Sequence, residues 1–277
     1  MLQAITAIDF HEMTRAVVDQ LKESVTGDNF KLVIFDNISQ EPYVRSEFGD
    51  APFPIDIVMP HKNRGYYYPV KTLLEMYPKE KYISIMHNDL YIYEKGWNER
   101  LEACFEADQK LGLVGFVGSH EIDHQGGRGS GTMCYFRGDK GQDQTAGVRI
   151  TDLRPSLVLD SLYMAFRAEA IPDLAIDEDI TLGHFYDKIW PCTLIRNNWR
   201  VATLGVEVDH LGGVSTMAVQ RWYDDCKAWF EERGKTWGEW GPETEMYLES
   251  SKRFVNEFLE FIPSFINHNY EIRGWPW

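Results

Sequence analysis

The stretch Tyr82-Ile83-Ser84-Ile85-Met86-His87-Asn88-Asp89-Leu90 is the most informative part of this chain. An apolar run with the character of a β-strand ends in three polar residues, the last of which, Asp89, carries a carboxylate. The strands of α/β proteins direct their carboxyl ends at the ligand crevice, so Asp89 is placed to meet a ligand there. Carboxylate oxygens suit Mg²⁺ or Mn²⁺, which makes Asp89 a candidate metal ligand. An ordinary turn would explain Asn-Asp as well, so other motifs must decide.

Segments with strand and helix character alternate along most of the chain. A strand over 3–9, a helix over 11–25 and a strand over 30–35 form a βαβ unit, which implies parallel pairing with a right-handed crossover. Further strands are expected at 55–59, 81–86, 113–118, 158–166 and 201–208, and helices at 70–77, 96–111 and 182–195, the last broken by Pro191. The pattern predicts an α/β domain over residues 1–213, with a mostly parallel central sheet flanked by helices.

Two segments depart from this alternation. Residues 119–150 are rich in Gly, Asp and Gln, and a loop of that length is expected to be either a lid over a ligand or an insertion. From Thr216 the pattern is helical, and six of the nine tryptophans lie between Trp222 and Trp277. We therefore expect a Trp-rich helical extension over 214–277, packed on the main domain, with its aromatic residues serving as core.

The composition excludes some classes of protein. A net charge of −15 disfavours non-specific binding to DNA or anionic lipid, although a local basic groove stays open. No run of about 18 apolar residues is present, so no membrane span is expected. The first residues have no basic segment of a signal peptide, and four widely spaced cysteines are expected to be reduced thiols. These features favour a cytoplasmic location.

Polar residues follow two further strands. Asp36 and Asn37 end the strand at 30–35, where a carboxylate can accept a hydrogen bond from a nucleobase N–H, or can cap the following turn. His210 follows the strand at 201–208 and precedes Gly212 and Gly213. A neutral imidazole there could complete a Mn²⁺ site, or could be a structural histidine.

A candidate base lies near the start of the helix at 182–195. Asp187 is placed there to remove a proton from a hydroxyl, or to interact with the helix dipole, and residues 177–179 are acidic rivals for the base role. We interpret His87, by contrast, as an ordinary residue at the end of its strand.

In their order along the chain, these motifs resemble a glycosyltransferase of the GT-A fold, close to family 2. The resemblance covers roughly residues 3–213. It rests on the following segments: Asp36-Asn37-Ile38-Ser39, Asn63-Arg64-Gly65, His87-Asn88-Asp89, Gly96-Trp97-Asn98-Glu99, Leu113-Val114-Gly115, Asp160-Ser161, His184-Phe185-Tyr186-Asp187 and Asp209-His210-Leu211-Gly212-Gly213. Ile189 departs from the pattern, because that family has a second carboxylate two residues after the base.

The resemblance implies a metal-dependent, inverting transfer of a hexosyl or pentosyl group from a nucleoside-diphosphate sugar, with a UDP-sugar favoured, to an acceptor hydroxyl. By that resemblance the roles are distributed as follows: Asp36, Asn37, Asn63, Arg64 and Asn88 contact the donor; Asp160 and Ser161 contact the acceptor; Asp89 and His210 bind Mn²⁺ or Mg²⁺; and Asp187 is the catalytic base.

Two other functions stay open on the sequence. A nucleotidyltransferase would need a Gly-rich, basic loop after the first strand, where this chain has Asp9-Phe10-His11-Glu12. A catalytically inactive binder of nucleotide sugars would explain Ile189. The acceptor stays open among a saccharide, which we favour, a lipid-linked sugar, a protein and a modified nucleobase in DNA. A nucleobase acceptor would need a basic stripe, for which the segment from Arg137 to Arg154 is the candidate.

Overall fold

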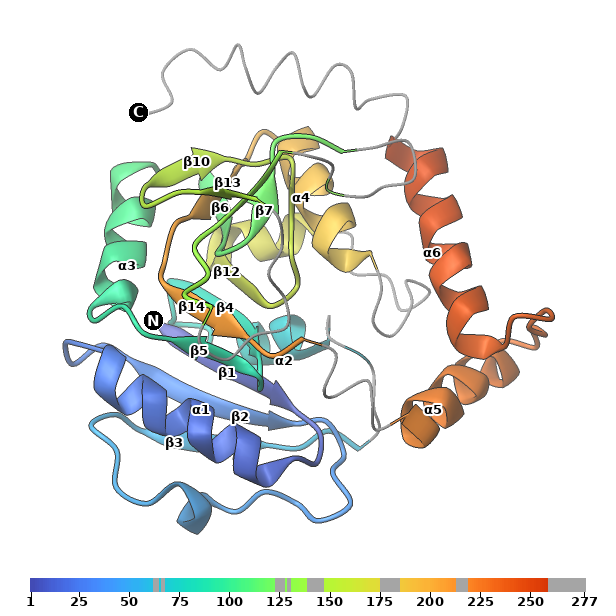
Figure 1. The fold of residues 1–277 in the computed structure, drawn as a ribbon, viewed down its shortest axis with the longest axis horizontal. Helices are drawn as coiled ribbons and strands as arrows, with labels where there is room; N and C mark the ends of the chain where they lie inside the picture. The colour runs from blue at the N-terminus through green and yellow to red at the C-terminus, as the bar shows by residue number, and fades with distance from the viewer. Residues whose placement is uncertain are drawn as a thin grey trace.

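A mixed sheet forms the centre of the molecule (Figure 1). The computed structural model describes residues 1–61, 65, 68–122, 128, 131–138, 147–174, 185–212 and 219–258. Within them, eight strands pair in the order β10 (Leu153–Pro155), β13 (Arg200–Leu204), β6 (Leu111–Gly115), β12 (Tyr163–Arg167), β4 (Tyr82–His87), β1 (Leu2–Ala7), β2 (Lys31–Asp36) and β3 (Ile55–Val58).

The sheet is mostly parallel, as predicted. β3, β2, β1 and β4 are parallel neighbours, and β6 and β13 are parallel to each other. β12 runs antiparallel to both β4 and β6, and β10 runs antiparallel to β13. The carboxyl ends of β2, β1 and β4 therefore meet at one edge of the sheet, where residues that follow these strands can act together.

Helices cover both faces of the sheet (Figure 1). α1 (His11–Ser24) and α3 (Trp97–Ala107) pack on one face, and α2 (Tyr68–Met76) and α4 (Tyr186–Arg196) on the other. Alternation along β4 sends Met86 to the first face and Ile85 to the second. Each fully buried aliphatic side chain contributes about 1.5–3 kcal/mol by leaving water. Both faces are apolar cores, which explains why the inner strands have largely apolar sequences.

Three strands predicted as single runs are divided in the structure. In the segment 113–118, β6 ends at Gly115 and a second strand, β7 (Gly118–Ser119), begins at Gly118. β7 belongs to a small sheet with β11 (Val158–Leu159), β8 (Thr132–Cys134) and β9 (Val148–Arg149). A Cβ at Gly118 would lie 2.2 Å from Oγ1 of Thr203, so the chain can turn there only with glycine. The segment 158–166 is divided by a turn in which Oδ1 of Asp160 accepts a hydrogen bond from the backbone N–H of Leu162.

The third divided segment, 201–208, supplies β13 and then β14 (Val208–His210). β14 pairs antiparallel with β5 (Leu90–Ile92), outside the central sheet. Short 3₁₀ helices occur at Arg45–Phe48 and Ala168–Asp173. Within the predicted loop 119–150, residues 123–127, 129–130 and 139–146 lie outside the described residues.

Pro191 does not break its helix, contrary to the prediction. α4 runs without interruption from Tyr186 to Arg196, with Pro191 in its second turn. There the missing proline N–H leaves only the carbonyl of Asp187 without its helical donor. Burial of Ile189 and Trp190 against the sheet offsets this cost, since both are about 1% exposed.

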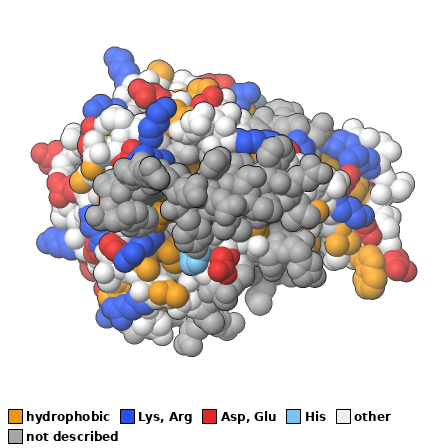
Figure 2. All heavy atoms as spheres, turned by 90° about the horizontal axis from the view of Figure 1, so that it is seen from above, with side chains coloured by type: hydrophobic (Ala, Val, Ile, Leu, Met, Phe, Trp, Pro, Cys, Tyr) orange, Lys and Arg blue, Asp and Glu red, His pale blue; other side chains and the backbone are white. Residues whose placement is uncertain are grey.

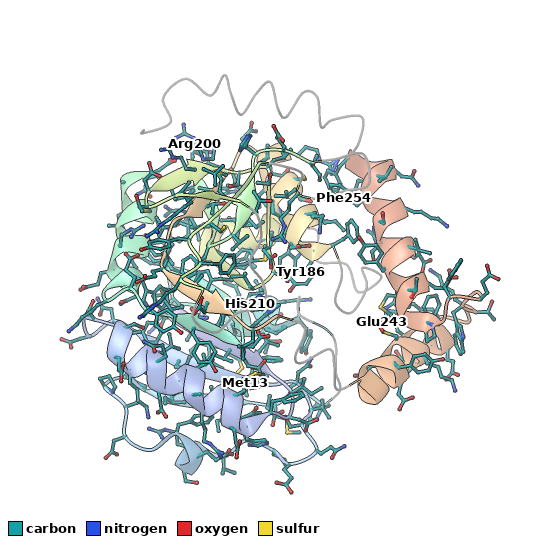
Figure 3. The ribbon with its side chains drawn as sticks, viewed as in Figure 1. Met13, Tyr186, Arg200, His210, Glu243 and Phe254 are labelled. Atoms are coloured by element: carbon teal, nitrogen blue, oxygen red, sulfur yellow. The ribbon has the colours of Figure 1, made fainter. Side chains whose placement is uncertain are left out.

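The C-terminal part that is described consists of α5 (Val219–Glu232) and α6 (Pro242–Phe258). Phe254 and Phe258 of α6 join the core that contains residues of α4. Figure 3 shows Phe254 on the side of α6 that faces α4. The two helices share a separate apolar cluster that includes Trp229, which confirms the prediction of an aromatic core, whereas Trp240 is 66% exposed. The four cysteines are free thiols, as predicted. Among the described helices, none has the length and apolarity needed to cross a membrane.

Candidate active site

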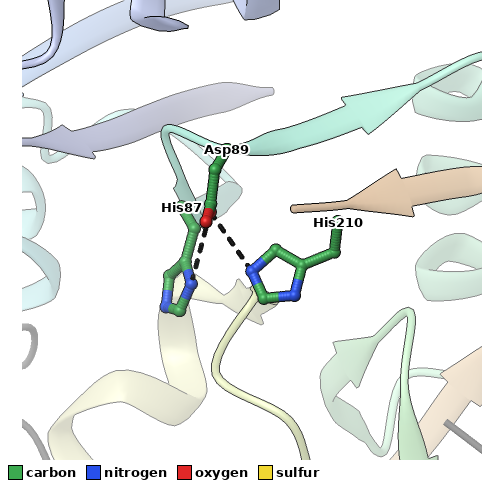
Figure 4. Close-up of side chains that lie close together, drawn as sticks. All are labelled: His87, Asp89 and His210. Atoms are coloured by element: carbon green, nitrogen blue, oxygen red, sulfur yellow. Dashed lines mark ion pairs between the residues drawn. The ribbon is translucent and has the colours of Figure 1, made fainter. Parts of the chain in front are cut away.

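Two histidines surround the Asp89 carboxylate (Figure 4). Oδ1 of Asp89 lies 3.2 Å from Nε2 of His210 and 3.8 Å from Nδ1 of His87. One ligand atom from each of the three residues lies within 4.8 Å of the others. Asp89 is 1% exposed and His210 is 6% exposed, so the group is enclosed by protein. Three potential metal ligands thus converge at the carboxyl end of β4.

The local backbone explains this convergence. β4 ends at His87, whose N–H donates to the carbonyl of Leu162, and the chain turns at Asp89 into β5. The β5–β14 ribbon places His210 opposite Leu90, and the N–H of Leu211 donates to the carbonyl of Asp89. In Figure 3, His210 lies near the middle of the molecule. The histidine and the aspartate, distant in sequence, are therefore fixed by backbone pairing.

The electrostatics of the group suit a metal. Burial alone would raise the pKa of Asp89, but His210 and His87 outweigh it and hold the pKa below its usual range. Burial lowers the pKa of His87, which keeps its imidazole neutral, as metal binding requires. The interpretation of His87 as an ordinary residue at a strand end was therefore incomplete, because its ring belongs to the group.

The donor set fits a divalent transition metal. Oδ1 of Asp89 is buried, and its ionic contacts within the described residues are with ring nitrogens of His210 and His87, which are themselves potential metal ligands. One carboxylate with two imidazoles suits Mn²⁺ better than Mg²⁺, which requires oxygen ligands. Three protein ligands would leave further coordination positions for a substrate.

Charged residues extend from the candidate metal ligands towards α4. The guanidinium of Arg128 donates to Oδ2 of Asp160. Burial would raise the pKa of Asp160, but Arg128 and His210 lower it below its usual range. Asp160 is thus kept as a carboxylate close to the histidines. Ser161 follows it in the turn before β12 and is half-buried.

Asp187 lies in the first turn of α4, and its pKa is shifted in the opposite direction to that of Asp160. Nζ of Lys188 is 3.3 Å from both of its carboxylate oxygens. Burial raises the pKa of Asp187, Lys188 and Arg128 lower it in part, and the nearby charge of Asp160 raises it further. The net result is a carboxyl group that binds a proton more readily than an ordinary aspartate does, which is the property of a stronger base.

Asp36 holds the loop that follows β2. Its Oδ1 accepts the N–H of Ser39 at 2.8 Å, and its Oδ2 accepts the N–H of Tyr43 at 3.0 Å. This is the turn-capping role that the sequence left open, and each oxygen keeps a second lone pair for another donor. The N–H of Asn37 donates to the carbonyl of Ala7. Recognition of a nucleobase by Asp36 stays a prediction.

The other predicted donor contacts are placed as follows. Asn88 is 2% exposed, and its Nδ2 donates to Oγ1 of Thr14 at 3.2 Å, beneath α1. Its contact with ribose or diphosphate stays a prediction. Asn63 and Arg64 lie outside the described residues, as do the rival acids at 177–179.

Arg128 and His87 are the candidate site residues that sequence reasoning missed. A spacing of two residues between His87 and Asp89 is a signal that could have been used, because both side chains leave the same end of a strand. Arg128 carries no such signal, since it lies alone inside a Gly-rich run and reaches Asp160 only through the fold.

The described arginines of the predicted basic segment are exposed, but each also has a local contact within the chain. Arg137 lies over the ring of Tyr93, Arg149 lies over the ring of Tyr135, and Arg154 is paired with Asp152. On the face drawn in Figure 2, the Lys and Arg side chains of the described residues are interspersed with Asp and Glu. These observations do not favour DNA as the acceptor.

Solved structures match nearly the whole chain. GalNAc-T7, crystallised with UDP, GalNAc and Mn²⁺, covers 95% of the chain with a TM-score of 0.60 at 12% identity. The fold is that of the GT-A glycosyltransferases. TarS 1–349 of S. aureus covers 99% with a TM-score of 0.53 at 11% identity, and its complex with UDP-GlcNAc matches with a TM-score of 0.54.

The comparisons bear on the fold rather than on a particular reaction. The chain spans 57% of the GalNAc-T7 chain and 75% of TarS 1–349. No protein-family model matches the sequence, and no curated protein matches it. The reaction of this GT-A chain must therefore be argued from its own residues.

Proposed function

We propose that this chain is a metal-dependent, inverting glycosyltransferase that moves a sugar from a nucleoside-diphosphate sugar, a UDP-sugar above all, to an acceptor hydroxyl. The observation that carries the proposal is the group of His87, Asp89 and His210 at the carboxyl end of β4 in a GT-A sheet. Two matched proteins were crystallised with UDP or UDP-GlcNAc, and one of them also with Mn²⁺, which supports the choice of donor and metal.

The proposed reaction assigns the proton to Asp187. Its carboxylate accepts the proton of the acceptor hydroxyl while that oxygen forms a bond to the anomeric carbon from the face opposite the nucleotide. The bond between the anomeric carbon and the phosphate oxygen breaks, and nucleoside diphosphate leaves. Asp89, His87 and His210 would hold a divalent metal ion, which would supply stabilisation of the charge that develops on the diphosphate.

The remaining predicted residues divide between donor and acceptor. Asp36 would accept an N–H of the nucleobase, with Asn37, Asn63, Arg64 and Asn88 in the rest of the donor site. Asp160 and Ser161 would bind hydroxyl groups of the acceptor. A neutral saccharide is the acceptor class we favour, because a net charge of −15 disfavours a polyanion.

The proposal predicts metal-dependent release of nucleoside diphosphate from one donor. The measurement uses a panel of UDP-, GDP- and ADP-sugars, with Mn²⁺ and with EDTA. Release from one donor that EDTA stops would support the transferase. Binding of a nucleotide sugar in calorimetry without any release, with saccharide acceptors present, would instead support the inactive binder. Pyrophosphate release from a nucleoside triphosphate with a sugar phosphate would support the nucleotidyltransferase.

A second prediction concerns Arg128, which lowers the pKa of Asp187. In Arg128→Gln the pKa of Asp187 rises further, so the acid limb of the pH profile of kcat/KM should move to higher pH at saturating Mn²⁺. Arg154→Gln, which removes a surface partner of Asp152, is the matched control and should leave the profile in place. An unchanged profile in Arg128→Gln would mean that Asp187 does not set the acid limb.

A further inference from the structure

Buried hydrogen bonds connect three strand ends at the carboxyl edge of the sheet. Asn88, after β4, donates from Nδ2 to Oγ1 of Thr14 in α1 at 3.2 Å. Oγ1 of Thr14 lies 2.8 Å from the hydroxyl of Tyr43, which donates to the carbonyl of Asp9, after β1. The backbone N–H of Tyr43 donates to Oδ2 of Asp36, at the end of β2.

The chain of bonds has a definite direction. A tyrosine hydroxyl has one proton, and that of Tyr43 goes to the carbonyl of Asp9, so its oxygen accepts from Thr14. The hydroxyl of Thr14 also lies 3.4 Å from the carbonyl of Phe10, and its oxygen accepts from Asn88. Thr14, Tyr43 and Asn88 are each 3% exposed or less. Leaving such buried polar groups without hydrogen bonds would cost free energy. The bonds therefore hold Asn88, after β4, and Asp36, after β2, at a fixed spacing.

The backbone beside this series of hydrogen bonds has an unfavourable conformation at three residues. Asp9, Phe10 and Ile38 have φ values of 51°, 52° and 67°, in the left-handed region that non-glycine residues rarely adopt. The N–H of Asp9 donates to Oγ of Ser39, and the ring of Tyr43 stacks on His11 at 4.0 Å. Such strain persists only where surrounding contacts determine it, and it is common at ligand sites.

We propose that Tyr43 is a positioning residue that couples the nucleobase end of the donor site, at Asp36, to the metal end, at Asp89. The inference rests on the proposed function of both ends. A nucleobase bound at Asp36 would order the loop that carries Tyr43, and through Thr14 and Asn88 it would order the turn that carries Asp89. A metal that binds next then loses less conformational freedom, so the two ligands bind cooperatively.

The test separates this coupling from direct contact between nucleotide and metal. Uridine lacks the diphosphate, so any effect of uridine on metal affinity must pass through the protein. The affinity for Mn²⁺ is measured by electron paramagnetic resonance of the free ion, without and with saturating uridine, and likewise with adenosine, cytidine and guanosine. In the wild type one nucleoside should tighten Mn²⁺ binding about five-fold or more. In Tyr43→Phe and Thr14→Val the ratio should fall to about one, while each ligand still binds alone.

Matched variants control for simple loss of packing. Thr14→Ser keeps the hydroxyl and should keep the coupling. Tyr82→Phe removes the hydroxyl of another buried tyrosine, bonded to Glu106 at the amino end of β4, and should also keep it. Coupling that is absent from the wild type, or that survives in Tyr43→Phe, overturns the inference while the proposed function stands. A wild type that binds neither nucleoside nor Mn²⁺ overturns both.

Discussion

Asp89→Ala is expected to reduce metal-dependent release of nucleoside diphosphate by about 10³-fold, because the stabilisation of a leaving diphosphate by a metal amounts to several kcal/mol. Asp89 supplies the carboxylate of the group, and the two histidines that remain would each be a neutral ligand. The affinity for Mn²⁺, measured by paramagnetic resonance of the free ion, should fall together with the rate.

Asp108→Asn is the matched control for this variant. Asp108 is also a buried aspartate in an ionic contact, since its Oδ2 lies 2.9 Å from Nη1 of Arg200, but it lies at the amino end of β6. The control should lose stability in thermal unfolding without losing Mn²⁺ affinity. Full donor turnover by folded Asp89→Ala, or by the wild type in EDTA, would show that the reaction does not use a metal at Asp89.

The inner strands of the central sheet were predictable because they are buried on both faces. β1, β2 and β4 are largely apolar and buried, with turn residues after them, and a βαβ unit allows essentially one handedness. The edge strand β10 is short and only partly buried, and it was not predicted. The position of Asp89 at a strand end followed directly. Pro191 misled the prediction, since the local cost of a proline was weighed without the burial of its neighbours in α4.

The composition of the site was only partly predictable, because backbone pairing between distant segments decides it. His210 was a candidate because glycines follow it in the sequence. Its position beside Asp89, however, depends on the pairing of β14 with β5, and the prediction of a single strand over 201–208 did not include that pairing. Asp36 shows the reverse difficulty. A carboxylate after a strand suits both a turn and a ligand, and the structure shows its bonds to the turn.

Asp187→Asn is expected to reduce sugar transfer to the acceptor by about 10²–10⁴-fold, the contribution that a positioned base makes to a reaction. Asparagine keeps the shape of the side chain but cannot accept the proton. Donor affinity, measured by calorimetry with the nucleotide sugar, should change little because the proposed donor contacts lie at Asp36 and Asp89. A large loss of donor affinity in this variant would instead indicate that Asp187 maintains the structure around α4.

The pH dependence gives an independent test of the same residue. Burial raises the pKa of Asp187, so its protonated, inactive form persists to a higher pH than it would in an ordinary aspartate. The rate in the wild type should therefore decline, as pH falls, through a pKa above the usual range of about 4 for aspartate. Lys188→Met removes the ammonium group that lowers this pKa, so it should move the decline to still higher pH. If the decline moved to lower pH in Lys188→Met, or stayed where it is, the group that titrates would be one other than Asp187.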